Sequence, residues 1–185
     1  MGRFILGAIL GAVLVPLAVL GWFRFGKPPV AVSDPPLPFE KQIVSVPLHA
    51  RIDREMKTSP IAVNEDNLTA GAQIYSDKCA VCHGFHGKPS TIGPHMYPRA
   101  PMLWEKHKND DVVGVSDDPP GETYWKVANG IRLTGMPAFD HTLTDTQMWQ
   151  VSVLLANADK PLPPEVLSIV NGEQPEAAAP AVKKK

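Results

Sequence analysis

The chain opens with a long apolar run. Residues 4–23 contain no charged side chain, and Arg24 and Lys27 follow them closely. As a helix, such a run extends about 30 Å, which is the thickness of the hydrocarbon core of a bilayer. Pro16 lies inside the run, and proline is tolerated in membrane helices. The pattern predicts an N-terminal transmembrane anchor over residues 1–24, with a cleaved signal peptide as the alternative.

Three further segments have helical periodicity, and no segment alternates as a strand does. The first begins after a candidate cap, the second ends at a glycine suited to a left-handed turn, and the third begins with a capping box. Their key positions are Asn64 or Asn67, Leu68, Ala72, Tyr75 and Cys79; Tyr124, Val127, Ala128, Ile131 and Gly130; and Thr144, Gln147, Met148, Val151, Ser152 and Leu155. Turns rich in glycine and proline separate them, so the pattern predicts a small all-α body.

We place this body at residues 61–165. Residues 25–60 contain seven prolines. Because proline resists helix and sheet, this segment is predicted to be an extended, semi-rigid linker. Residues 166–185 are predicted to be a disordered C-terminal tail, since the chain from Gln174 onward is mostly proline, alanine and lysine without apolar periodicity.

The charge and the size of the chain limit the classes of function that it can have. The chain has 185 residues with 18 basic and 19 acidic side chains, so its net charge is close to zero. A protein without excess positive charge has no general electrostatic attraction to nucleic acid, and no nucleic-acid partner is predicted. The body at 61–165 is acidic, with 13 acidic and 8 basic side chains. Three short helices bury too little apolar surface for a body of this size, which points to a bound group at its centre.

The two cysteines of the chain lie in one pentapeptide, Cys79-Ala80-Val81-Cys82-His83. A Cys-x-x-Cys-His run is the attachment pattern of c-type haem, in which two thiols bond the porphyrin and the adjacent histidine ligates iron. Residues three apart on a helix project to neighbouring positions, so both sulfurs reach one edge of the macrocycle. A thioredoxin-like pair would need a preceding strand, and a zinc site would need a second ligand pair. One covalently attached haem c, with its iron, is therefore predicted.

With this motif, residues 67–160 resemble a class I cytochrome c. The resemblance rests on the helix that runs into the motif and Gly84, on a middle helix, and on Gly135-Met136-Pro137 before the last helix. In that family the first and last helices cross through a small residue and aromatic residues, which Gly71, Tyr75 and Trp149 match. Residues 125–139 are similar to bacterial membrane-linked monohaem cytochromes. The resemblance implies an all-α domain of three to five helices around one haem.

The second axial ligand of the iron separates electron carriers from haem enzymes. The candidates are Met96, Met102, Met136, Met148, His86, His95, His107 and His141. Met136 is favoured, because Gly135 lets the backbone approach the porphyrin and Pro137 stiffens the loop. Met148 lies on an apolar helix face and is predicted to be core. Ligation by His83 and Met136 favours reduced iron and leaves no open position for a substrate.

The resemblance also implies two contacts around the haem. A ligating histidine donates its second ring N–H to a carbonyl. In this family a proline shortly after the motif accepts it, and Gly93-Pro94 resembles that element. Arg99 lies where the family places a partner for a haem propionate, with Arg132, Tyr97 and Trp104 as alternatives.

The resulting interpretation is an electron carrier and not an enzyme, since no acid–base pair or nucleophile supports catalysis by side chains. The haem domain would exchange electrons with redox partner proteins while a single span anchors it in a bacterial inner membrane. It would face the periplasm, because the resemblance implies haem attachment outside the bacterial cytoplasm. One alternative is a haem subunit of a membrane dehydrogenase or oxidase complex. Another is a haem enzyme or gas sensor with an open sixth site.

Overall fold

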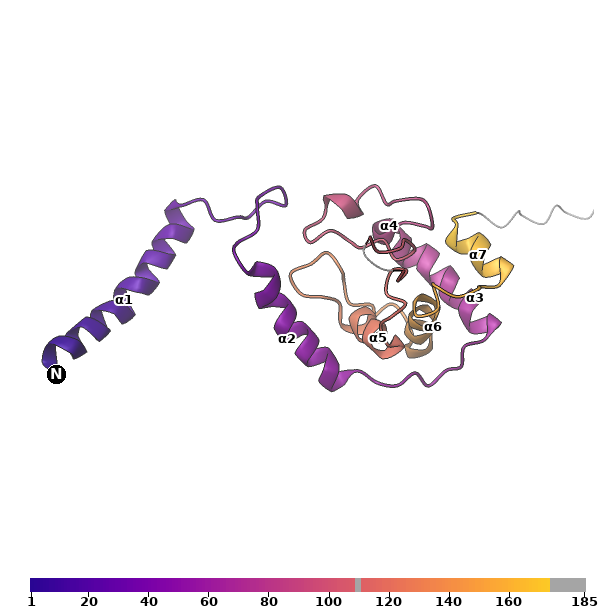
Figure 1. The fold of residues 1–185 in the computed structure, drawn as a ribbon, viewed down its shortest axis with the longest axis horizontal. Coiled ribbons are helices and arrows are strands. Elements are labelled where there is room, and N and C mark those ends of the chain that lie inside the picture. Colours follow the sequence, from indigo (N-terminus) through magenta and orange to yellow (C-terminus); the bar gives the residue numbers. More distant parts are fainter. Residues whose placement is uncertain (109–110, 174–185) are drawn as a thin grey trace, which may run out of the picture. The chain divides into compact units, whose positions relative to one another are not determined.

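The computed structural model describes residues 1–108 and 111–173. The elements within these residues are helices, joined by loops that contain two isolated bridges (Figure 1). They are α1 (Gly2–Phe25), α2 (Glu40–Glu55), α3 (Glu65–Ile74), a π-helical turn (Tyr75–Cys79), α4 (Ala80–His83), a 3₁₀ turn (Gly93–His95), α5 (Pro120–Asn129), α6 (Asp145–Leu155) and α7 (Pro164–Val170). The all-α prediction is confirmed. The chain divides into two compact units, Met1–Ile43 and Val44–Lys185.

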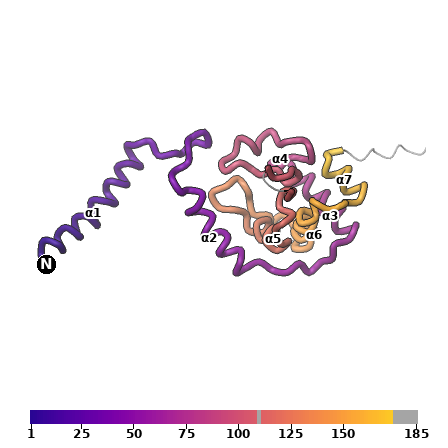
Figure 2. The backbone as a smooth tube through the Cα atoms, viewed as in Figure 1, coloured from indigo at the N-terminus to yellow at the C-terminus, as the bar shows by residue number. Residues whose placement is uncertain are grey.

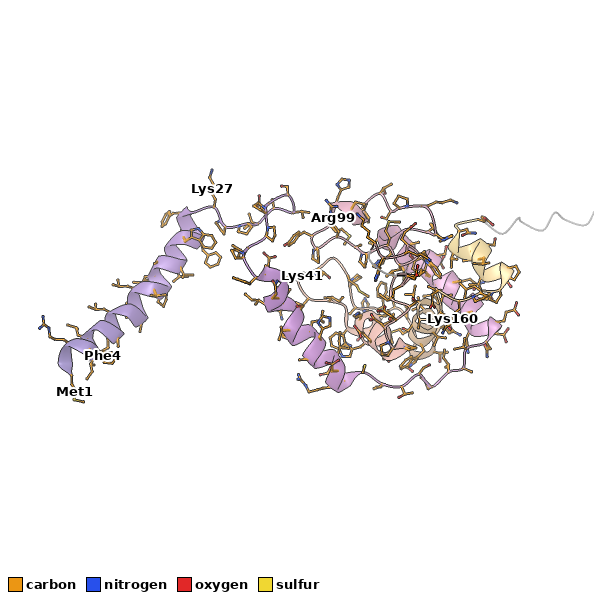
Figure 3. All side chains as sticks on the ribbon, in the orientation of Figure 1. Met1, Phe4, Lys27, Lys41, Arg99 and Lys160 are labelled. Carbon is orange, nitrogen blue, oxygen red and sulfur yellow. The ribbon has the colours of Figure 1, made fainter. Side chains whose placement is uncertain are left out.

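The first unit is dominated by α1. This helix has 24 residues and, among the described residues, is the one helix long and apolar enough to cross a membrane. None of its residues is buried within the protein, and its side chains project into open space around it (Figure 3). Pro16 lies inside α1. Helix α1 therefore has the length and the exposed apolar surface of a single-pass membrane anchor.

The core of the second unit is formed by α3, α5 and α6, and α7 packs against α3 (Figure 1). Helices α3 and α6 cross at Gly71, where an added Cβ would collide with the carbonyl oxygen of Gln150. Tyr124 of α5 stacks on Trp149 of α6 with ring centroids 4.1 Å apart. Met148, predicted to be core, is buried on α6.

The predicted helix ends are confirmed. The Asn64 side chain accepts the backbone N–H of Asn67 at 2.9 Å, which caps the start of α3. Thr144 and Gln147 form the capping box of α6. Helix α5 ends at Gly130, whose φ of +66° lies in the left-handed region that glycine adopts without strain. Each of these ends depends on contacts within a few residues, which a sequence pattern reveals.

The linker prediction was wrong for a large part of residues 25–60. Helix α2 lies there, with Pro47 inside it, and Ile52 is only 1% exposed. Pro47 removes one backbone hydrogen bond at an exposed position, where water can replace that bond. Burial of Ile52 within the second unit stabilises α2, because helices in proteins depend more on tertiary packing than on local propensity.

The tail prediction also began too early. Helix α7 begins with Pro164 in its first turn, a favoured position, and buries Val166 and Val170 one helical turn apart. The Val170 carbonyl accepts the N–H of His86 at 2.9 Å, so α7 is tied to the segment that follows α4. The rest of the predicted tail, 174–185, lies outside the described residues.

Candidate functional site

The helix that leads to the cysteines changes its winding just before them. After α3, residues Tyr75–Cys79 make one π-helical turn, in which the Tyr75 carbonyl accepts the N–H of Ala80. Such turns are rare, and those that do occur are often found at functional sites. Cys79 precedes α4 and Cys82 lies within it, and both are free thiols and partly buried. The predicted attachment residues thus lie at the start of one short helix and within it.

The ring of His83 is held by the main chain. Its Nδ1 atom lies 2.7 Å from the carbonyl oxygen of Pro101. This bond requires the proton on Nδ1, which leaves the Nε2 lone pair free for a metal. Burial lowers the pKa of His83, and the Pro101 bond opposes this effect to a smaller extent. The imidazole is therefore kept neutral, the form that binds iron.

The prediction that Pro94 provides this carbonyl was wrong, since Pro101 provides it. Gly93 packs so closely under the Cys82 carbonyl that an added Cβ would collide with it. The Gly93 carbonyl accepts the N–H groups of Met96 and Ala100, so the chain turns at Pro94 and returns to His83 only at Pro101. The family expectation thus identified the right kind of acceptor but the wrong proline.

Tyr75 ties the two ends of the motif together. Its hydroxyl donates a 2.6 Å hydrogen bond to the carbonyl of Gly84, the residue after His83. Its ring is fully buried and meets the Trp104 ring edge-on, with centroids 5.5 Å apart. Burial raises the pKa of Tyr75, so the hydroxyl keeps the proton that it donates. The same environment raises the pKa of Cys79 to about 12, mainly through burial and to a smaller extent through Cys82.

The loop that carries Met136 hangs from the end of α5. The Ile131 N–H donates to the Met136 carbonyl at 3.2 Å, and the Phe139 N–H donates to the Val127 carbonyl of α5 at 3.0 Å. The Thr134 hydroxyl accepts the N–H of Met136 at 3.1 Å and donates to the Ile131 carbonyl at 2.7 Å. The Met136 side chain is partly buried against the core. Both ends of this loop are therefore pinned to α5.

The other candidate ligands have different surroundings. Met148 is in the core, while His95 and His107 are exposed and Met102 is partly buried. His86 and His141 are exposed, with their Nδ1 atoms 3.1 Å from Asn171 and 3.3 Å from Asp140 respectively. Met96 is different, because its methyl group lies where an added Cβ on Gly135 would be. The structure thus brings Met96 next to the Met136 loop, and it is the strongest reserve ligand.

The described residues fit a covalently bound haem. They present two free thiols, an imidazole with an available Nε2 and a methionine on a loop next to the core. The Trp104 Nε1 is buried and has no hydrogen-bond partner of good geometry within the described part of the chain, although the Tyr75 hydroxyl lies close to it. A haem propionate is a suitable acceptor for such a donor. Arg99, labelled in Figure 3, is exposed on the loop between α4 and α5, and its propionate role stays a prediction.

Three features of the site were missed in the sequence. Pro101 was one of several prolines after the motif, and nothing local distinguishes it. The Tyr75 ring was expected in a helix crossing, but the bond of its hydroxyl to Gly84 was not; a tyrosine on a buried helix face is a signal for such a bond. The contact of Trp125 with α2, described below, has no local signal, because the prolines of residues 25–60 predict a linker there.

Residues 66–155 match a family model described as "Cytochrome C oxidase, cbb3-type, subunit III". The match begins in α3 and ends with α6, so it includes the Cys79–His83 motif and Met136. Helices α1, α2 and α7 lie outside it. No curated protein matches the chain.

Proposed function

We propose that residues 66–155, which match the family model, form a class I c-type cytochrome domain that serves electron transfer. In this domain His83 and Met136 ligate the iron of one haem that is bonded to Cys79 and Cys82. The observation that carries this proposal is the 2.7 Å contact of His83 Nδ1 with Pro101, which leaves Nε2 for the metal beside two free thiols. The haem, when bound, supplies an iron that gains and loses one electron.

The chain contributes three things to this chemistry. It holds His83 neutral and in one tautomer, it presents both thiols from one short helix, and it pins the Met136 loop to α5. With both His83 and Met136 as ligands, the chain would leave no open position on the iron for a substrate, and the bound haem would supply one-electron chemistry. The domain therefore carries single electrons between protein partners.

Helix α1 anchors the domain in a bacterial inner membrane as a single span, with the haem domain in the periplasm. The length and apolar surface of α1 support the anchor. The distribution of positive charge does not decide the orientation, because Arg3 precedes the helix core and Arg24 and Lys27 follow it. The orientation is supported instead by the chemistry of haem attachment.

The family description favours a second candidate function, in which the domain is the haem subunit of a membrane oxidase complex. Extraction with mild detergent distinguishes the two. Stoichiometric co-purification with an integral membrane haem protein supports the complex, whereas a monodisperse single chain supports the free carrier.

Met136→Ala in the haem-loaded protein tests the ligation. We expect loss of the sulfur-to-iron charge-transfer absorption of the oxidised form, together with rapid binding of carbon monoxide by the reduced form. Met96→Ala, which changes the neighbour of the same loop, is the matched control and should leave both properties intact. A spectrum changed by Met96→Ala alone would assign the ligand to Met96. Rapid carbon monoxide binding by the unmodified protein would instead favour a haem enzyme or gas sensor.

A further inference from the structure

Helix α2, outside the residues that match the family model, contacts α5 through a charged cluster. The Glu55 carboxylate accepts the indole N–H of Trp125 at 2.9 Å and the Arg51 Nε–H at 2.9 Å. The Arg51 guanidinium lies over the Trp125 ring, 5.7 Å from its centroid. Trp125 is only 8% exposed. A residue inside the cytochrome domain is thus engaged by side chains that precede that domain.

A buried apolar side chain of α2 and one close backbone approach to α5 adjoin this cluster. Ile52 is 1% exposed, and the Lys57 carbonyl lies so close to Gly121 that an added Cβ there would collide with it. The side chains of Arg51 and Glu55 are 59% and 43% exposed, so water screens their ion pair. The burial of Ile52 and the close backbone approach therefore contribute more to the attachment than the ion pair does. We call Arg51, Ile52, Glu55 and Lys57 the α2 clamp.

Helix α5 connects the α2 clamp to the Met136 loop. The clamp holds α5 at Gly121 in its first turn and at Trp125 in its middle. The Val127 carbonyl of α5 accepts the N–H of Phe139 at the far end of the loop. The loop begins directly after Gly130, where α5 ends. A displacement of α5 would therefore move both ends of the loop that carries Met136.

We propose that the α2 clamp is a positioning element for Met136, which holds α5, and through it the ligand loop, in the arrangement in which the sulfur reaches the iron. This inference rests on the proposed ligation by His83 and Met136. Helix α2 follows the membrane anchor, with residues 26–39 between them. Since the clamp holds α5, a partner that displaces α2 would also weaken the bond between the iron and the Met136 sulfur. The segment before the domain is then part of its redox machinery and not a passive spacer.

The experiment uses the full-length, haem-loaded chain in detergent with the variants Ile52→Ala and Trp125→Phe. The first readout is trypsin cleavage after Arg51, Arg54 and Lys57, which reports release of α2. The second is displacement of the methionine by imidazole, followed through the sulfur-to-iron charge-transfer absorption. We expect both rates to rise about tenfold in the variants, the size that a typical destabilising substitution produces.

Two matched changes serve as controls. His49→Ala alters an exposed residue of the same helix and retains every trypsin site, so it should change neither rate. Glu55→Gln keeps an acceptor oxygen for the Trp125 N–H and should stay closer to the parent than Glu55→Ala. If Ile52→Ala does not accumulate as folded protein, Trp125→Phe and Glu55→Ala test the attachment of α2 to α5 through the hydrogen bond between Glu55 and Trp125.

The possible failures are distinguishable. Faster trypsin cleavage with unchanged imidazole displacement would mean that the clamp holds only α2, which overturns the inference. Equally fast cleavage in the parent protein would mean that α2 is not held, which also overturns it. Failure of the proposed ligation has another signature. The parent protein would then lack the charge-transfer absorption and bind imidazole at once, while the trypsin pattern still reported a clamped α2.

Discussion

The two sides of the candidate haem site are held in different ways. The attachment side is a helical segment from α3 to α4 that crosses α6 with backbone against backbone at Gly71. The ligand side is the loop after Gly130, which reaches the core through the partly buried Met136. The loop hangs from α5, whose Trp125 donates a hydrogen bond to Glu55, 70 residues earlier in the sequence. Figure 2 shows the path of the chain from α4, on the attachment side, to α5, which precedes the ligand loop.

This difference follows the chemistry that each side performs. In the proposed function two covalent bonds would form at Cys79 and Cys82, and close backbone contacts at Gly71 and Gly93 hold the segment that presents them. The bond between iron and a thioether is weaker and exchangeable. Under the proposed ligation it would be formed by Met136, on a loop whose close neighbour, the Met96 methyl group, is the end of a flexible side chain. Rigid support lies where bonds are permanent, and adjustable support lies where the ligand can exchange.

The largest effect that we expect is on the reactivity of the Cys79 thiol before haem attachment, which reports how firmly the attachment side is packed. Burial raises the pKa of Cys79 to about 12. At pH 8 its thiolate fraction is then roughly a thousandfold below that of an ordinary thiol. In haem-free Cys82→Ser protein, the alkylation rate of Cys79 should therefore keep rising with pH above about 10. A plateau near pH 9 would reveal an exposed thiol and a loose attachment side.

The same raised pKa makes the haem-free protein less stable in alkali. In the unfolded chain Cys79 loses its proton first, so between the unfolded and folded pKa values the folded state binds more protons. The free energy of unfolding then falls as pH rises through this range and is unaffected below it. Burial raises the pKa of Tyr75 as well, which adds in the same direction. Urea unfolding midpoints at pH 7 and pH 10 measure the fall.

Gly71→Ala should disrupt the rigid side. The new methyl group would meet the Gln150 carbonyl, and neither backbone can move without separating α3 from α6. We expect a loss of about 3 kcal/mol in the free energy of unfolding, which exceeds the gain of roughly 1 kcal/mol in helix propensity. Thr69→Ala on the same helix removes a buried hydroxyl without a hydrogen-bond partner in the described residues, and should cost little. A Gly71→Ala protein as stable as this control would contradict the close crossing.

The sequence predicted features that depend on near neighbours better than features that depend on distant partners, for a physical reason. The cap at Asn64, the capping box at Thr144 and the turn at Gly130 depend on neighbours within four residues or on one backbone angle. The Cys79–His83 motif is likewise local. Each of these features is written in a short stretch of sequence.

Helices α2 and α7 were missed because their stability comes from distant partners. Ile52 is buried by parts of the second unit that no local pattern identifies, and Pro47 argued against a helix. Val166 and Val170 are two apolar residues in a short helix, too few for a clear period. Pro101 was missed because the return of the chain to His83 depends on the turn at Gly93.

Tyr75→Phe tests the tie across the attachment motif at moderate cost. The change removes the hydroxyl and leaves the Gly84 carbonyl, in a buried region, without this donor. We expect the free energy of unfolding to fall by about 1–2 kcal/mol. Tyr124→Phe is the matched control, because it removes a tyrosine hydrogen bond to Asp145 at a more exposed place. Equal losses in the two variants would mean that Tyr75 makes no special contribution.

Gly135→Ala should have the smallest effect on the free energy of unfolding, although its added Cβ would overlap the Met96 methyl group. The obstacle is the tip of an unbranched side chain that can turn away, whereas the obstacle at Gly71 is backbone. We expect a loss below about 1 kcal/mol and an unchanged charge-transfer absorption, with Met96→Ala restoring any loss in the double variant. Denaturation of the Gly71→Ala and Gly135→Ala proteins side by side measures the contrast directly. If the two losses were equal, the ligand loop would be as rigid as the helix crossing, and the distinction between the two sides of the site would be wrong.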